Sequence, residues 1–183
     1  MDLFEQMNSL KIYYNIIIKN TLINKFNYNS LKKIPRIKNI TLNFNCKKFE
    51  LKQLATSLLA LELITKKRGE ITTATKPNLI LKIKKGNPVG CKIILKKKSM
   101  YDFFSIFIFK ILPSLKNSTK KKIKKSNNIT YTIINTLLFK KLEKNYIIFN
   151  TLQNININIA TNTKTKQELF FLLKLFKINN LTL

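Results

Sequence analysis

The sequence GNPVGCKIIL (86–95) joins a glycine-rich turn to a segment that alternates between two kinds of side chain. Its first six residues hold two of the chain's three glycines and one of its four prolines. From Val89 onward, Val89, Cys91, Ile93 and Leu95 alternate with Lys92, Ile94 and Lys96, which is typical of a half-buried strand. The stretch before it, LILKIKK (79–85), is also apolar and basic. The sequence therefore predicts a tight turn between two basic strands.

Two further segments alternate with period two. NITLNFN (39–45) places Ile40, Leu42 and Phe44 on one side and Asn39, Thr41, Asn43 and Asn45 on the other. NININIATN (154–162) likewise separates Ile155, Ile157 and Ile159 from Asn156 and Asn158. Each pattern predicts a strand with one apolar face and one polar face. The apolar runs 129–139 and 145–149 are interpreted as strands too, and the lysine-rich run 116–128 as a charged loop.

Helical spacing predicts four helices, near residues 2–24, 48–65, 99–113 and 165 onward. Three of them open with a capping-box pattern: Asp2 with Glu5, Ser99 with Asp102, and Thr165 with Glu168. The order of elements interleaves helices with runs of strands. It predicts one α+β domain over residues 1–183, an antiparallel sheet with helices packed on one face and the other face left to solvent or a partner.

The charge of the chain points to an anionic partner. Lys and Arg number 35 against 8 Asp and Glu, giving a formal charge of +27. Such an excess repels itself in a compact fold, so a nucleic acid or an anionic membrane surface is expected beside it. Only Arg36 and Arg68 are arginine, and lysine favours phosphate contacts over base reading. A/T-rich codons also enrich lysine and asparagine, and we take both causes to apply.

Enzymatic chemistry is not expected. The chain has no histidine, its acids form no close pairs, and Cys46 and Cys91 stand alone, so we predict no catalytic site, metal or cofactor. The apolar run 103–112 is too short to span a membrane and contains Lys110. The N-terminus carries two acids and no arginine, unlike an import sequence, so if the protein acts in an organelle we expect it to be made there.

Three stretches resemble, in the same order, hallmark segments of a known family. They are FNYNSLKKIPRIKNITLNF (26–44), residues 71–104 with GNPVGCKIILKKKSMYDFF, and ININIATNTKTKQELFFLL (155–173). The family is uL5, the universal large-subunit ribosomal protein that holds 5S rRNA in the central protuberance. The segment 114–150 departs from the family pattern, because it has a lysine cluster and apolar runs but no glycine.

The resemblance implies a set of partners and a location. The partners are large-subunit rRNA, 5S rRNA where the organelle retains it, the peptidyl-site tRNA, neighbouring central-protuberance proteins and a uS13-family protein across the intersubunit bridge. A composition driven by A/T-rich codons and the N-terminus favour a mitochondrial ribosome in the matrix over a plastid one. The alternative reading is a polybasic peripheral membrane protein that holds anionic lipid with its lysines and the aromatic run 103–109.

Two candidate rRNA sites follow. The first is the polar face of the predicted sheet: Asn39, Thr41, Asn43, Lys92, Lys96, Asn156 and Asn158. Amides and hydroxyls on a rigid sheet can reach 2′-hydroxyls and base edges of A-form RNA, and the alternative is a plain solvated face. The second is Asn27, Tyr28, Asn29 and Ser30 with Lys32, Lys33 and Arg36. There an aromatic ring can stack on a base, unless Tyr28 is tucked into the core.

A third candidate is the loop 72–85, which the resemblance directs toward the peptidyl-site tRNA. Its hydrogen-bonding and cationic residues are Thr73, Thr75, Lys76, Asn78, Lys82, Lys84 and Lys85. At its base, Gly86 and Gly90 are expected to supply backbone angles that other residues resist, with Pro88 stiffening the return. The alternative is a hairpin that docks on neighbouring rRNA. A fourth candidate, the run Lys120–Lys125, is interpreted as a generic phosphate-contacting loop.

Overall fold

An antiparallel sheet forms the centre of the molecule. The computed structural model describes residues 10–45, 51–80, 82–115, 119–125 and 127–178. The six strands are β1 (Ile37–Asn45), β2 (Glu70–Thr73), β3 (Pro88–Leu95), β4 (Thr119–Lys125), β5 (Asn128–Ile133) and β6 (Ile155–Thr161), in the order β2-β3-β1-β6-β5-β4. All neighbouring strands are antiparallel. The α+β prediction is confirmed.

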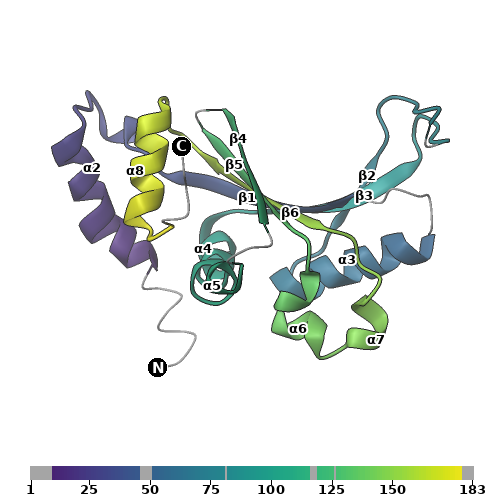
Figure 1. Cartoon of the computed structure of the whole chain (residues 1–183). Coiled ribbons are helices and arrows are strands. Elements are labelled where there is room, and N and C mark those ends of the chain that lie inside the picture. Colours follow the sequence, from purple (N-terminus) through teal and green to yellow (C-terminus); the bar gives the residue numbers. More distant parts are fainter. Residues whose placement is uncertain (1–9, 46–50, 81, 116–118, 126, 179–183) are drawn as a thin grey trace.

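Helices cover one face of this sheet (Figure 1). They are α3 (Leu51–Thr65), α4 (Lys97–Ile106), which continues through a π-helical turn (η3, Phe107–Ile111) into α5 (Leu112–Ser114), then α6 (Lys140–Glu143) and α7 (Tyr146–Phe149). At one end of the sheet, α2 (Lys19–Lys25) lies beside α8 (Lys166–Leu175) (Figure 1). The β2–β3 hairpin projects at the opposite end. We call the helix side the covered face and the other side the open face.

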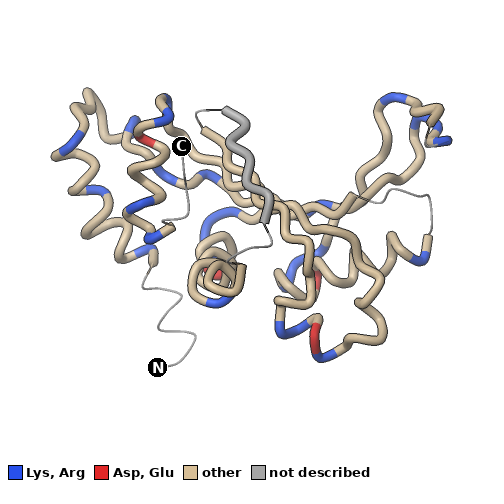
Figure 2. Tube along the Cα trace, in the orientation of Figure 1, with Lys and Arg blue, Asp and Glu red and all other residues tan. Residues whose placement is uncertain are grey.

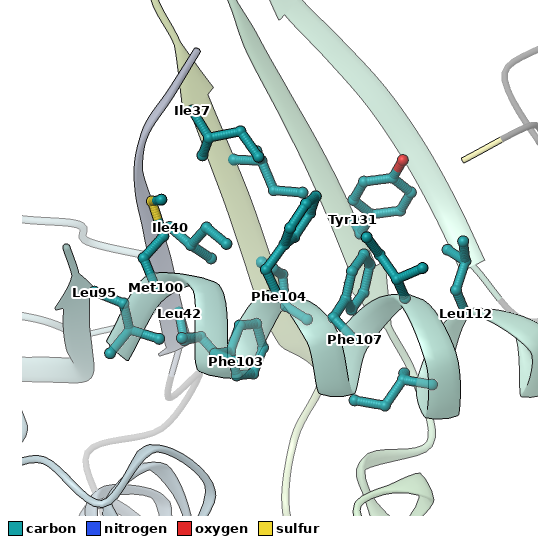
Figure 3. Packing of buried hydrophobic residues seen from close by; sticks show 14 of the residues in the cluster. Ile37, Ile40, Leu42, Leu95, Met100, Phe103, Phe104, Phe107, Leu112 and Tyr131 are labelled. Atoms are coloured by element: carbon teal, nitrogen blue, oxygen red, sulfur yellow. The ribbon is translucent and has the colours of Figure 1, made fainter. Parts of the chain in front are cut away.

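The core fills the covered face. The isoleucines of β6 and Ile40, Leu42 and Phe44 of β1 are all buried. In Figure 3, Phe104 of α4 and Phe107 of η3 point toward these strands and toward Tyr131 of β5. The rings of Phe107 and Tyr131 meet edge to face with centroids 5.3 Å apart. Each such buried side chain contributes about 1.5–3 kcal/mol, so the alternation of the strands fixes which face takes the helices.

The prediction of a charged loop over residues 116–128 is wrong for most of that range. Residues 119–125 form β4, which pairs with β5 along its length, for example Lys120 with Thr132. β4 lies at the edge of the sheet. Residues 116–118 and 126 lie outside the described part of the chain. Edge pairing of β5 thus outweighed the low strand propensity of lysine.

Two apolar runs were interpreted as strands, with different outcomes. The run 129–139 is a strand only to Ile133, and a 3₁₀ turn (η4, Thr136–Leu138) follows, in which the Asn135 side chain accepts from the Leu137 N–H. The strand prediction for the run 145–149 is wrong, because residues 146–149 form the short helix α7, with Phe149 buried and Ile147 exposed. A five-residue apolar run carries no period long enough to separate helix from strand.

The predicted capping boxes also differ in outcome. The box of Thr165 with Glu168 is confirmed at the start of α8. The box of Ser99 with Asp102 is wrong: α4 already begins at Lys97, and the Ser99 hydroxyl donates to the Lys96 carbonyl. The pair Asp2 and Glu5 lies outside the described residues. The first described helix runs from Leu10 to Lys25 and includes a π-helical turn (η1, Tyr14–Ile18).

Candidate nucleic-acid interface

Polar side chains form two rows across the open face. In the first row, Asn43 of β1 is paired with Lys92 of β3 and with Asn156 of β6, which is itself paired with Thr132 of β5. In the second row, Thr41, Asn158 and Thr130 are aligned in the same way, and the exposed apolar Ile94 takes the corresponding place on β3. Asn39 lies one register step further along β1, opposite Ala160. The structure therefore brings the predicted sheet residues together on one surface.

Hydrogen bonds order these rows. The Thr132 hydroxyl donates to Asn156 Oδ1 at 2.8 Å, and the Thr130 hydroxyl lies 3.5 Å from Asn158 Oδ1. Since the amide oxygens accept from threonine, the Nδ2 groups are the donors that the open face offers to a partner. Sequence reasoning missed Thr130 and Thr132 as members of this surface. The alternation within ITYTI (129–133) could have identified them, had register with β6 been known.

Lys92, on the open face, forms an ion pair with Glu70. Lys92 Nζ lies 3.6 Å from Glu70 Oε2 of β2, and both side chains are substantially exposed. An exposed pair of this kind contributes little to stability, so Lys92 can exchange its partner for a phosphate. Lys96 is exposed immediately after β3. Figure 2 shows the other lysines spread over the hairpin and the helices, with few acids among them.

In the second candidate site, Tyr28 packs against the core while the other residues are exposed. The Tyr28 ring packs against Phe26 with centroids 6.2 Å apart, and its buried hydroxyl has no hydrogen-bond partner among the described residues. Burial raises the pKa of Tyr28 to about 12. The ring thus follows the core alternative, while the other site residues are exposed: Asn27, Asn29, Ser30, Lys32, Lys33 and Arg36. Asn162 anchors this turn to the end of β6, because its side chain bonds the Arg36 N–H and the Ile34 carbonyl.

The third candidate site is a hairpin extension of β2 and β3. Ala74 and Gly86 hold its base, and Asn78 and Ile83 exchange two backbone hydrogen bonds of 2.9 Å near the tip. The seven predicted side chains of this loop are all exposed: Thr73, Thr75, Lys76, Asn78, Lys82, Lys84 and Lys85. At the tip, Leu79 and Ile80 are 92% and 93% exposed. The hairpin therefore carries cations on its arms and aliphatic side chains at its end.

The two glycines at the base of the hairpin act differently. Gly86 has φ of +90°, the left-handed region that glycine tolerates, so the expectation for it is confirmed. The expectation for Gly90 is wrong, since it is not among the residues with positive φ. A Cβ at Gly90 would instead collide with the carbonyl oxygen of Phe44 on β1. Close approach of two strands, rather than an unusual angle, explains this glycine. Pro88 is the first residue of β3.

The aromatic run that suggested lipid binding belongs mostly to the core. Phe103, Phe104 and Phe107 are buried, and only Phe109 of this run's phenylalanines is exposed, at 52%. Among the described helices, none is both long and apolar enough to cross a bilayer. Cys91 is buried in β3, and Cys46 lies outside the described residues. The described part of the chain contains no group of three potential metal-binding side chains. Of Lys120–Lys125, only the backbone pairing with β5 is described.

Comparisons with known proteins agree on one family. Residues 88–179 match the model for the C-terminus of the ribosomal L5 family. The chain is 37% identical over 177 residues to large ribosomal subunit protein uL5m of Reclinomonas americana, covering 94% of this chain and 97% of that protein. It is 32% identical over 168 residues to uL5 of Buchnera aphidicola, covering 88% and 92%, and 30% identical over 176 residues to uL5 of Neisseria gonorrhoeae, covering 93% and 97%.

Proposed function

The chain belongs to the uL5 family of large ribosomal subunit proteins, and from this premise we propose that its open face binds ribosomal RNA. The family consists of structural constituents of the ribosome rather than enzymes. The observation that carries the proposal is the pair of polar rows, of which the first extends over β3, β1, β6 and β5 and the second over β1, β6 and β5. The RNA partner is 5S rRNA in the central protuberance where the ribosome retains it, and otherwise large-subunit rRNA at the same place.

The rows suit the shallow groove of an A-form helix. That groove displays 2′-hydroxyls and base edges, which the Asn43, Asn156 and Asn158 amides can bond without deep insertion. Lys92 and Lys96 neutralise phosphates beside them, and the exposed cations of the turn 27–36 extend the contact past the end of β1. The protein acts as a scaffold: it fixes RNA segments relative to one another on a rigid sheet and reads little sequence.

The hairpin contacts the peptidyl-site tRNA in this proposal. Its lysines stand on a narrow two-stranded arm that projects from the sheet, away from α2 and α8 (Figure 1). Contacts from lysine point charges release easily, which suits a ligand that leaves at every cycle. A uS13-family protein across the intersubunit bridge and neighbouring central-protuberance proteins complete its surroundings. Similarity to uL5m and the lysine-rich composition support the mitochondrial matrix as the location of this ribosome.

Binding of a central-protuberance rRNA fragment tests the open face. We expect affinity to fall steeply between about 50 and 200 mM salt, with a log–log slope of about −0.7 to −0.9 per neutralised phosphate. Replacing both Asn43 and Asn156 by alanine should weaken binding by about tenfold, because each lost hydrogen bond contributes about 0.5–1.5 kcal/mol. Fluorescence anisotropy with labelled RNA measures both effects.

A matched double variant controls for the loss of two amides. Asn145→Ala with Asn150→Ala removes two exposed amides beside α7, on the covered side of the sheet. It should bind the RNA fragment as the unchanged protein does. Equal weakening in the two double variants, or an affinity that does not change with salt, would remove the open face as the RNA site.

A further inference from the structure

A small apolar slot on the covered side has a rim of lysines. It lies between the helix formed by α4 and η3 and the segment formed by η4 and α6, with a volume of about 170 Å³. Apolar side chains form its walls: Ile64, Phe103, Ile106, Ile111, Leu138 and Phe139. The rings of Phe103 and Phe139 stack with centroids 6.5 Å apart in one wall. Lys110, Lys140 and Lys141 complete the lining. We call it the lysine-rimmed slot.

Positive charge surrounds Lys141 at the rim of the slot. Lys141 Nζ donates to the Leu63 carbonyl at the end of α3, at 2.7 Å, and partial burial together with the charge of Lys66 lowers the pKa of Lys141. The ion pair of Lys92 with Glu70 lies at another part of the molecule. Glu62, on the last turns of α3, accepts from the Gly69 N–H. Carboxylates from another molecule would offset this positive charge.

The size and lining of the slot favour one kind of occupant. At about 170 Å³ it is smaller than the roughly 300 Å³ at which small-molecule sites begin, so it suits a single side chain. Its walls are apolar and its rim is cationic. RNA phosphates would satisfy the lysines but would leave the apolar walls facing sugar and phosphate. An acidic protein segment with one large apolar side chain satisfies both parts.

We propose that the lysine-rimmed slot docks an acidic segment of a neighbouring protein, which inserts one apolar side chain between Phe103, Ile106 and Leu138. The slot lies on the face opposite the polar rows, so RNA and this protein can be bound at the same time. The site is independent of rRNA binding, and each can fail without the other. The lining draws Leu138, Phe139, Lys140 and Lys141 from the segment 114–150, which lies outside the three stretches that carried the resemblance in the sequence analysis.

Binding of two labelled peptides tests the proposal with the full chain. One is an acidic peptide with a single central leucine, and the other has a glycine in place of that leucine. The unchanged protein should bind the first about tenfold more tightly, the effect of burying one large apolar side chain. Lys110→Ala with Lys140→Ala should weaken binding of the first peptide by about tenfold, and Leu138→Asp should abolish the preference between the peptides.

A charge-matched variant distinguishes the slot from general attraction to acids. Lys82→Ala with Lys84→Ala removes two cations from the hairpin and should leave peptide binding within about twofold. Equal weakening by both double variants, or equal binding of both peptides, overturns the proposal. A ten-nucleotide oligouridine provides the last arm. If it displaces the peptide from the unchanged protein and its own affinity depends on Lys110 and Lys140, the slot is an RNA contact and the proposal is wrong.

Discussion

The two faces of the sheet are built from the same strands but serve different ends. Along β6, Ile155, Ile157 and Ile159 are fully buried under helices, while Asn156 and Asn158 between them stay half exposed. The buried residues contribute to the free energy of unfolding, and the half-exposed ones contribute little to it. Because their spacing is two residues, core and binding surface cannot shift relative to each other. A rigid arrangement of polar groups is therefore a consequence of the packing beneath it.

A variant on the covered face alone should change stability the most. Phe104 is fully buried and meets Phe176 edge to face at 5.1 Å. Phe104→Ala should lower the free energy of unfolding by about 3–5 kcal/mol, since it leaves a cavity that its neighbours fill incompletely. Urea unfolding followed by circular dichroism measures the change. Phe109→Ala, at a half-exposed position further along the same helix, should change stability by less than about 1 kcal/mol. Similar losses in both would contradict the assignment of the core.

A second variant tests how closely the strands approach beneath the hairpin. Gly90→Ala adds a methyl group where the Phe44 carbonyl lies, and we expect a loss of about 2–3 kcal/mol because β3 must shift against β1. Gly86→Ala meets no atom within 4 Å, so only its positive φ carries a cost, about 1–2 kcal/mol. Thermal unfolding of the two variants side by side measures the difference. A larger loss for Gly86→Ala would reverse the roles assigned to the two glycines.

The difference between the faces also explains what the sequence alone could predict. Strands β1, β3 and β6 were predicted because their apolar and polar residues alternate over seven or more positions. The same alternation placed Asn43, Lys92 and Asn156 on one surface, although only the register made them neighbours. The sequence predicts an unusual backbone angle at Gly90, whereas the structure shows that a side chain there would collide with β1. Such a collision with another strand leaves no local signal in the sequence.

The errors cluster where pairing or packing between distant segments decides the structure. β4 consists largely of lysine and is a strand because β5 offers it an edge. Tyr28 is drawn into contact with Phe26, whose ring also meets Phe171 of α8 at 5.8 Å. The lysine-rimmed slot likewise combines residues of α3, α4, η3, η4 and α6. Period and propensity describe a single segment, so neither detects such meetings.

A buried hydroxyl makes the stability of the folded protein depend on pH. The Tyr14 hydroxyl donates to the Pro35 carbonyl at 2.9 Å, and burial, aided by nearby Tyr101 and opposed by Arg36, raises the pKa of Tyr14 to about 12. An unfolded tyrosine has a pKa of about 10, so the folded state favours the neutral form. The stability contributed by Tyr14 is therefore complete below about pH 10 and is lost as pH rises toward about 12.

The variant Tyr14→Phe isolates this contribution. At about pH 8 it should lower the free energy of unfolding by about 1 kcal/mol, the value of one hydrogen bond. Between about pH 10 and 12 the difference between the two proteins should shrink, since only the unchanged one must ionise a buried phenol. Urea unfolding at several pH values measures it, with the exposed Tyr146→Phe as the control. A difference that stays constant with pH would show that Tyr14 ionises as freely as in the unfolded chain.

The smallest expected effect concerns the acid beside the polar rows. Glu70 pairs with Lys92 at 3.6 Å on the open face, so an RNA phosphate must displace or accompany that carboxylate. Glu70→Gln should strengthen binding of the rRNA fragment by about two- to fivefold at low salt and leave the stability nearly unchanged, since exposed pairs contribute about 0–1 kcal/mol. Lys92→Ala should act in the opposite direction and make the salt slope shallower by about 0.7–0.9.

An acid on the other face of the sheet separates the effect of position from the effect of net charge. Glu143→Gln removes one negative charge at α6 on the covered side, and it should leave RNA affinity within about twofold once salt screens distances beyond about 10 Å. If Glu143→Gln strengthens binding as much as Glu70→Gln does, the RNA responds to the total charge of the chain. If only Glu70→Gln strengthens it, the phosphates lie beside β2 and β3, on the face that the helices leave open.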